Sequence, residues 1–292
     1  MPAINLPPAL DAPCHQITLS AGETSYYIDN AHNDARPLVL LHSINAAPSA
    51  REMQPLFDHY RHTRTVYVPD LPGYGRSERS DQPYSPTLYA TFIREFLEQV
   101  VGQPADIVAF SLTAEFAARA ISEDSTLAHS LALISPTGFS ARRAPTGPIT
   151  DRILRLLRLP LLGDGLYKLL TSRLSIRYFL GQAFIDKAPT RLTDYAHATA
   201  HQPGAKFAPF RFLSMKLFTP TAVDDLYVPL QLPVLVLYDR DPNISFEQLD
   251  IVEQQPNWKT VRISPTMGLP HWERPQQTTA ALDTFWAEVE AL

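Results

Sequence analysis

Short apolar runs alternate with helical patterns over the first 138 residues, and this alternation limits the fold more than any other feature of the chain. The apolar runs lie within 37–42, 64–77, 106–111 and 130–138, and the helical patterns cover 48–60, 86–101 and 112–123. Continuous apolar runs are typical of strands that are buried on both faces of a parallel sheet. The order of these elements predicts right-handed βαβ units, with helices on both faces of a mostly parallel, twisted sheet.

The alternation stops between residues 140 and 225, where proline and glycine interrupt helical patterns and no strand pattern occurs. It resumes with a strand, a helix, a strand and a terminal helix at 233–239, 245–255, 260–264 and 274–290. Residues 226–292 alone hold too few elements for a separate core. The chain is therefore predicted to have one α/β core formed by 1–139 and 226–292, with an inserted helical cap over 140–225. An alternating run at 25–31 predicts a further, half-exposed strand.

The composition is that of an ordinary soluble protein, with 19% charged residues, 45% hydrophobic residues and a net charge of −5. This balance gives no reason to expect a nucleic-acid partner. The single cysteine, Cys14, can form neither an internal disulfide nor a thiolate cluster, and no His, Asp or Glu residues show metal-ligand spacing, so no metal is expected. Because the sequence shows no signal-peptide pattern and no apolar run long enough to span a membrane, a cytoplasmic location is predicted by default.

Polar residues of three chemical types follow the predicted strands. Ser111 ends one apolar run, Asp239 and Asp241 follow another, and His271 lies after the last strand. The carboxyl ends of parallel strands face one crevice, so these side chains are expected to lie close together. A serine attacks at neutral pH when a histidine removes its proton and a carboxylate orients that histidine. The residues supply these types in the chain order Ser, Asp, His.

Five segments resemble motifs of the α/β-hydrolase fold family with a helical cap, and the resemblance spans nearly the whole chain. LLHSINAA (40–47) resembles the family's His-Gly loop after the third strand, and PDLPGYGRSE (69–78) resembles its Asp-x-Pro-Gly-x-Gly-x-Ser turn. VAFSLT (108–113) resembles the nucleophile elbow, while LYDRDPN (237–243) and GLPHWERP (268–275) resemble the acid and histidine segments.

The resemblance implies that Ser111 is the nucleophile, His271 the general base and Asp241 the carboxylate that orients it. Asp239 is the alternative acid, but the family's acid usually lies in a turn just past the strand, directly before a proline, as Asp241 does. The family's other acid position, after the preceding strand, reads SPTGF (135–139) here and holds no carboxylate.

The resemblance also places an oxyanion hole on the backbone N–H groups of Ile44 and Leu112. Main-chain donors tolerate any side chain. Nevertheless, the family's motifs prefer glycine at three positions that are occupied here by Ser43, Ala109 and Thr113.

Several neighbouring residues have less specific roles. Ser43, Asn45 and Phe110 are candidate substrate-binding residues, and the Ser43 hydroxyl is a candidate for an additional oxyanion donor. His42 is interpreted as a structural residue that ties down its loop. Glu115 is interpreted as a solvated glutamate or as one that compensates the helix dipole, and the alternative is a place near the pocket where it affects His271.

The predicted cap contains the amphipathic segment 150–162, in which Arg152, Arg155 and Arg158 are spaced three apart among leucines. The favoured interpretation is a helix that packs its leucines on the core while its arginines face water. The alternative is a cationic rim for an acyl substrate or for a membrane surface, and membrane contact is the less favoured of the two interpretations. The many aromatic residues of the cap favour a hydrophobic substrate.

Together these features predict a serine hydrolase without a cofactor, a carboxylesterase or thioesterase that cleaves a small, largely hydrophobic acyl substrate through an acyl-enzyme. Hydrolysis of a carbon–carbon bond and acyl transfer use the same triad and stay open. A serine at the elbow argues against the dehalogenase and epoxide-hydrolase members, which the resemblance associates with an aspartate. The alternative is a catalytically weak or silent member of the fold that acts as a binding or interaction protein, because three preferred glycines are replaced. The sequence does not indicate the oligomeric state.

Overall fold

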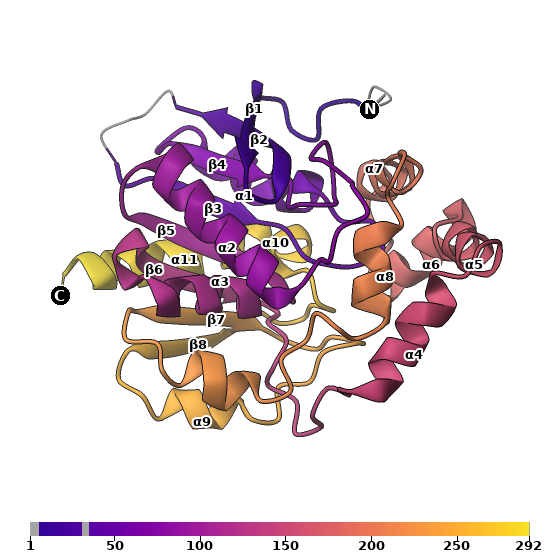
Figure 1. Ribbon diagram of the computed structural model, residues 1–292. Helices are drawn as coiled ribbons and strands as arrows, with labels where there is room; N and C mark the ends of the chain where they lie inside the picture. The colour runs from indigo at the N-terminus through magenta and orange to yellow at the C-terminus, as the bar shows by residue number, and fades with distance from the viewer. Residues whose placement is uncertain (1–5, 31–34, 292) are drawn as a thin grey trace.

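The computed structural model describes residues 6–30 and 35–291, and its centre is one eight-stranded sheet (Figure 1). The strands are β1 (Cys14–Leu19), β2 (Gly22–Asp29), β3 (Leu38–Leu41), β4 (Val66–Pro69), β5 (Ala105–Phe110), β6 (Ala128–Ile134), β7 (Val234–Tyr238) and β8 (Trp258–Arg262). Their order across the sheet is β1-β2-β4-β3-β5-β6-β7-β8. β2 is antiparallel to β1 and to β4, whereas the neighbouring strands from β4 to β8 are parallel. The predicted mostly parallel α/β sheet is confirmed.

The central strands are apolar over most of their length because both faces of the sheet are covered. Every residue of β3 and of β5 is buried. Leu40 of β3 pairs with Val108 of β5, and Val108 pairs with Ala132 of β6. Successive residues of β3 join different cores, since Val39 belongs to one and Leu40 to the other. The continuous apolar runs in the sequence therefore indicate a sheet between two helical layers.

The first two strands form an antiparallel edge of the sheet. The strand predicted at 25–31 corresponds to β2, which begins at Gly22 and ends at Asp29; residue 31 lies outside the described residues. β1 has no counterpart among the predicted strands, because its polar residues His15 and Gln16 are exposed and leave little apolar pattern. Its position is given by pairing with β2 rather than by burial.

Helices cover both faces of the sheet. On one face, α2 (Pro86–Phe96), α3 (Thr113–Glu123) and α9 (Leu249–Glu253) contribute to one core. On the other face, α1 (Gln54–Tyr60) and α11 (Pro275–Glu290) contribute to a second core. The connections contain the short helical elements η1 (Ala50–Met53), η2 (Leu97–Val101), η3 (Ser125–Leu127) and α10 (Pro270–Glu273). The helix predicted near 245–255 is present only as the five residues of α9.

Residues 140–225, here called the helical insert, contain helices and no strand. Its elements are α4 (Pro148–Leu157), α5 (Leu162–Leu170), α6 (Arg173–Gln182), α7 (Thr190–Ala200) and α8 (Phe207–Leu213), and η4 (Val223–Tyr227) begins inside the insert and ends two residues after it. The insert leaves the carboxyl end of β6 and returns before β7, and α4 to α8 gather at one side of the sheet, at right in Figure 1. The Tyr167 hydroxyl of α5 lies 3.4 Å from the carbonyl oxygen of Ala46, in the loop after β3. Among the helices of the described residues, none is long and apolar enough to cross a membrane.

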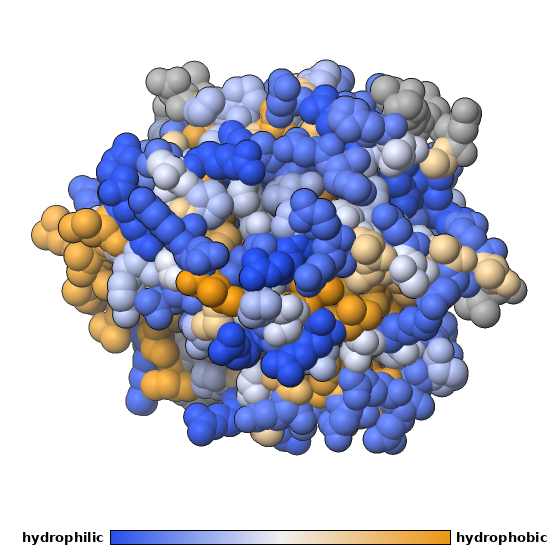
Figure 2. Space-filling view, turned by 180° about the vertical axis from the view of Figure 1, so that it is seen from behind, coloured by the Kyte–Doolittle hydropathy of each residue, from blue (hydrophilic) through white to orange (hydrophobic). Residues whose placement is uncertain are grey.

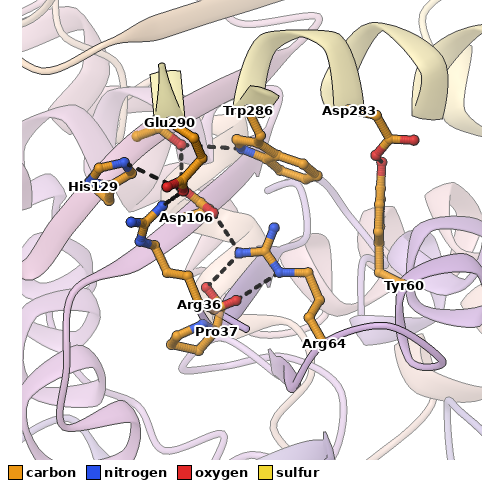
Figure 3. A network of polar contacts seen from close by, with 10 residues as sticks. Arg36, Pro37, Tyr60, Arg64, Asp106, His129, Asp283, Trp286 and Glu290 are labelled. Atoms are coloured by element: carbon orange, nitrogen blue, oxygen red, sulfur yellow. Dashed lines mark hydrogen bonds and ion pairs between the residues drawn. The ribbon is translucent and has the colours of Figure 1, made fainter. Parts of the chain in front are cut away.

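A buried polar network lies at the amino ends of the central strands (Figure 3). The Arg64 guanidinium is 2.5 Å from the Asp106 carboxylate at the start of β5, and the Ser130 hydroxyl of β6 donates to the same carboxylate. Trp286 of α11 donates to the Ser130 hydroxyl oxygen and its ring lies under the guanidinium. This end of the sheet is opposite the carboxyl ends of the strands, so the network joins strands and helix away from the predicted catalytic residues.

Candidate active site

Ser111 occupies a sharp turn between β5 and α3. Its φ is +58°, a value that residues other than glycine rarely adopt. The Ser111 N–H donates to the carbonyl of Ile134 in β6 at 2.9 Å, so the turn begins directly at the end of the sheet. The side chain is partly exposed, although its neighbours Phe110 and Leu112 are buried. The geometry is that of a strained strand-to-helix turn that presents a serine at the carboxyl edge of the sheet.

The turn accommodates Thr113 through a hydrogen bond. The side chain of Thr113 is fully buried, and its hydroxyl donates to the carbonyl oxygen of His42 at 2.6 Å. The hydroxyl therefore satisfies a buried backbone carbonyl and links the elbow to the loop after β3. Ala109 lies within β5 and pairs with Leu41 and Leu133 on either side. Neither replacement of glycine prevents the positive φ of Ser111.

The side chain of His42 is fully buried and stabilises the loop after β3 through two hydrogen bonds. One ring nitrogen, Nε2, accepts a hydrogen bond from the Leu71 N–H at 2.9 Å, and Nδ1 lies 2.7 Å from the Ser43 carbonyl oxygen. The two contacts define a neutral ring with the proton on Nδ1. Burial lowers the pKa of His42 to about 4, so the ring stays neutral at pH 7. These contacts agree with the structural role predicted for His42.

A buried glutamate, Glu52 of η1, organises the same loop. Its carboxylate accepts hydrogen bonds from the Ser43 N–H at 2.9 Å and from the Asn45 side-chain amide at 3.0 Å. The same amide group of Asn45 also donates to the Ser43 hydroxyl oxygen at 2.8 Å. Burial raises the pKa of Glu52 to about 7, although its hydrogen bonds to Ser43 and Asn45 oppose that rise. The side chains of Ser43 and Asn45 are thus engaged inside the loop, and their participation in substrate binding stays a prediction.

Two backbone amides remain available at this edge. The Ser43 N–H is used by Glu52, but neither the Ile44 nor the Leu112 N–H donates to another group within the described ranges. Both residues are almost completely buried. Buried N–H groups without an acceptor are rare in folded proteins, and they are the kind of donor that an oxyanion would accept from.

The two candidate acids have different surroundings. The Asp239 carboxylate accepts hydrogen bonds from Arg262 Nε at 2.7 Å and from the Thr266 N–H at 2.8 Å. Burial acts to raise the pKa of Asp239, but the hydrogen bonds from Thr266 and Arg262 outweigh it and hold the pKa below its usual value. Both oxygens of the Asp239 carboxylate therefore bind the end of β8 and the segment that follows it.

Asp241 faces the loop that leads to the histidine. Its carboxylate accepts hydrogen bonds from the N–H groups of Asn243 and Ile244 at 2.7 and 3.0 Å. It also lies against Gly268, because a Cβ added to that glycine would be 2.6 Å from Asp241 Oδ2. Burial raises the pKa of Asp241 to about 6, so most of the carboxyl is ionised at pH 7.

His271 lies in α10, next to the residue that precedes the candidate nucleophile. Its ring is fully buried and meets the ring of Phe110 edge-on, with 5.1 Å between the centroids. Nε2 is 3.0 Å from the carbonyl oxygen of Glu52, and Nδ1 is buried without a hydrogen-bond partner. Burial lowers the pKa of His271 to about 4, which keeps the ring neutral at pH 7.

The structure brings the three predicted residues to one edge of the sheet without joining them by hydrogen bonds. Ser111 follows Phe110, which contacts His271, and Asp241 contacts the glycine three residues before His271. In the described part of the chain, no hydrogen bond connects Ser111, Asp241 and His271 to one another. Among residues 6–30 and 35–291, no group of three or more His, Cys, Asp or Glu side chains could hold a metal ion.

The interpretation of Glu115 as a solvated residue is wrong. Its side chain is buried in the first turn of α3. The carboxylate accepts hydrogen bonds from the Thr137 hydroxyl at 2.5 Å and from the Thr219 N–H at 2.8 Å. Burial raises the pKa of Glu115 to about 7. Both partners are distant in sequence, so local helical spacing does not indicate that Glu115 is buried. The buried role of Glu52 was missed from the sequence for the same reason.

Comparisons with known proteins agree with this geometry. The sequence model described as "Alpha/beta hydrolase family" matches residues 38–282. No sequence among curated proteins matches the chain. Similar solved structures include a probable hydrolytic enzyme from Pseudomonas aeruginosa PAO1, with a TM-score of 0.75, 16% identity and coverage of 96% of both chains.

Two further structures are similar over nearly their whole length. A thermophilic esterase from Thermogutta terrifontis has a TM-score of 0.73 and 18% identity, covering 95% of this chain and 99% of its own. An enol-lactonase from Burkholderia xenovorans LB400 has a TM-score of 0.73 and 13% identity, covering 94% of this chain and 100% of its own. At these identities the likeness concerns the fold. The family model, in contrast, spans most of the sequence, and the chain belongs to the α/β hydrolase family.

Proposed function

We propose that this member of the α/β hydrolase family is a serine hydrolase that cleaves an ester or thioester through an acyl-enzyme. The observation that carries the proposal is the positive φ of Ser111 at the end of β5, with the side chain partly exposed. Such strain costs on the order of 1–3 kcal/mol and persists where the surrounding structure maintains it, most often at functional sites.

In the proposed reaction, Ser111 Oγ attacks the carbonyl carbon of the substrate while His271 takes the hydroxyl proton. The carbonyl oxygen becomes an oxyanion that accepts hydrogen bonds from the N–H groups of Ile44 and Leu112. His271 returns the proton to the departing alcohol or thiol as the acyl-enzyme forms. A water molecule then repeats the sequence, with His271 again as base, and releases the acid and free Ser111.

Asp241 is proposed to orient His271 and to stabilise its protonated form. The unpaired Nδ1 of His271 is the atom that would donate to this carboxylate. In the present contact Nε2 carries the ring proton and donates it to the Glu52 carbonyl. For the base to act, the imidazole must rotate away from this carbonyl and the proton must move from Nε2 to Nδ1, which leaves Nε2 free to accept the Ser111 proton. Catalytic hydrogen bonds are often long or poorly aligned before substrate binds, so the unlinked triad does not argue against the role.

The substrate is proposed to be small and largely hydrophobic. Phe110 lies against the ring of His271, and Tyr167 of the helical insert reaches the loop after β3, so both place aromatic side chains near the carboxyl edge of the sheet. The names of two similar structures, an esterase and an enol-lactonase, both describe cleavage of an acyl–oxygen bond. Carbon–carbon bond hydrolysis and acyl transfer remain alternatives with the same residues.

Initial rates on p-nitrophenyl esters of increasing chain length, beside acyl-CoA thioesters and a vinylogous diketone, test the proposal and identify the acyl group. We expect turnover of an ester or thioester that falls by on the order of 10³-fold or more in Ser111→Ala and in Asp241→Asn. Asp239→Asn is the matched control, because it removes the other candidate acid. A greater loss of rate in Asp239→Asn than in Asp241→Asn would assign the orienting carboxylate to Asp239.

A silent member of the fold, acting as a binding or interaction protein, is the second candidate. The hydrogen bond between His271 Nε2 and the Glu52 carbonyl favours it, since this contact occupies the atom that a base needs. A folded protein that turns over none of the three substrate classes supports this candidate, and turnover that depends on Ser111 excludes it.

A further inference from the structure

The helical insert exposes an unusual amount of apolar surface. Of the twelve large hydrophobic residues that are exposed within the described residues, eleven lie between 149 and 185. We call six of them the insert patch: Leu161, Leu162, Leu169, Leu174, Tyr178 and Phe179. Figure 2 shows the broadest apolar area at left, on the side where α4, α5 and α6 stand once the view of Figure 1 is turned. Exposed patches of this kind mark interaction sites.

Two leucines of the patch are almost as exposed as in an unfolded chain. Leu161 is 87% exposed and Leu174 is 81% exposed. Leu161 also has a φ of +66° and a ψ of −45°, a conformation that a leucine rarely adopts. The structure therefore maintains a strained residue whose side chain gains no burial in the folded protein. The interpretation favoured from the sequence is a helix that packs its leucines on the core while its arginines face water. This interpretation is only half correct, because Leu154 and Leu157 are buried but the leucines of the insert patch are exposed.

The charge around the patch has the opposite sign to the rest of the protein. Residues 140–190 contain nine basic and three acidic residues, a net charge of +6, so the remainder of the chain carries −11. Two of the three acidic residues are paired with lysines that flank α8: Asp164 with Lys206, and Asp151 with Lys216. By contrast, Arg152 and Arg177 are exposed, and neither has an acidic partner in the part of the chain that the structure describes.

Exposed leucines and aromatics beside arginines and lysines suit an anionic phospholipid surface. Apolar side chains enter the boundary between headgroups and acyl chains, tyrosine prefers that boundary, and basic side chains contact the anionic headgroups. A second copy of the chain fits less well. A symmetric dimer through the patch would place the +6 segment of one protomer against the same segment of its partner, and like charges in apposition disfavour such a contact.

We propose that the insert patch and its surrounding cations dock the protein on the surface of anionic phospholipid bilayers. The contact is peripheral: α5 and α6 lie on the bilayer with the patch entering the interface, while the sheet stays outside. The inference rests on the surface of the helical insert and does not depend on the catalytic role of Ser111.

Sedimentation of the full chain with vesicles tests this proposal. Vesicles of phosphatidylglycerol and phosphatidylcholine are compared with vesicles of phosphatidylcholine alone. We expect binding to the anionic vesicles, weakened by high salt.

The variant Leu161→Ser with Leu174→Ser should bind on the order of tenfold or more weakly. Arg152→Gln with Arg177→Gln should weaken binding by on the order of tenfold and reduce its salt dependence. Ile251→Ser is the matched control, because Ile251 is an exposed aliphatic residue of α9, outside the insert.

The outcomes separate the candidate occupants of the patch. All the substituted side chains are exposed, and an unchanged circular dichroism spectrum and melting temperature show that each variant folds. Binding that falls in the leucine pair but not in Ile251→Ser supports the proposal. No binding of the wild type to anionic vesicles overturns it. Analytical ultracentrifugation that shows a dimer dissociated by the leucine pair would also overturn it and would assign the patch to self-association.

Discussion

The buried carboxyl of Glu115 makes the stability of the protein depend on pH. Its pKa is raised from 4.5 to about 7 because the side chain is buried, with hydrogen bonds from Thr137 and Thr219 only partly offsetting that effect. The folded state therefore binds a proton at Glu115 more tightly than the unfolded state does. Acidification from pH 8 to pH 5 stabilises the folded state through this group, and the stabilisation disappears as the pH rises through 7.

Substitution of Glu115 by glutamine isolates this contribution. At about 1.4 kcal/mol for each pKa unit, the shift is worth about 3 kcal/mol in total, and about 2–3 kcal/mol of it falls between pH 5 and pH 8. Glutamine is neutral at every pH and keeps one acceptor oxygen. The free energy of unfolding of Glu115→Gln minus that of the wild type should therefore be about 2–3 kcal/mol higher at pH 8 than at pH 5, because only the wild type loses stability as its carboxyl ionises.

Urea denaturation at pH 5, 6, 7 and 8 measures this difference, and the other titrating groups cancel between wild type and variant. Glu98→Gln, a substitution at an exposed glutamate of η2, is the matched control and should show no such trend. A difference for Glu115→Gln that stays constant across this range would refute the reasoning, because it would mean that the buried carboxyl is ionised throughout.

Three further substitutions test the packing around the site and beneath it. Thr113→Val removes the hydroxyl that satisfies a buried carbonyl, so urea denaturation should show a loss of about 1–3 kcal/mol, which Thr113→Ser largely restores. Asp106→Ala leaves the Arg64 guanidinium buried without its partner and should cost about 3–5 kcal/mol by the same measurement; a cost under 1 kcal/mol would show that water reaches the pair. Gly268→Ala places a Cβ 2.6 Å from Asp241 Oδ2 at a φ of +116°, so both the stability and the rate of the proposed hydrolysis should fall, whereas unchanged values would show that this carboxylate moves freely.

Much of the fold could be predicted from local patterns. The apolar runs of β3, β5, β6 and β7 are continuous because both faces of the sheet are covered, and a continuous run is visible without knowledge of partners. The elbow at Ser111 is visible for a similar reason, since strand, serine and helix are adjacent in the sequence. Thr113 marks the limit of this approach: its hydrogen bond to the His42 carbonyl joins residues 71 positions apart.

The remaining features depend on contacts between distant segments. β1 has exposed polar residues and is defined by its partner strand, so its sequence alone does not identify it. The burial of Glu52 and Glu115 depends on Ser43, Asn45 and residues of the helical insert, which helical periodicity cannot indicate. The exposure of Leu161 and Leu174 is unpredictable for the same reason, because an amphipathic pattern does not tell which apolar residues find a surface to cover.

Covalent labelling by a fluorophosphonate tests the central claim most directly, because the reagent modifies a serine only when a base activates it. Intact mass and peptide mass spectrometry at pH 7.5 should show one adduct, on Ser111, in the wild type. The adduct should be absent in Ser111→Ala and retained in Ser135→Ala, a serine with positive φ at the neighbouring strand end. A folded wild type that stays unlabelled, or labelling that persists after Ser111→Ala, would contradict the assignment of Ser111 as the nucleophile.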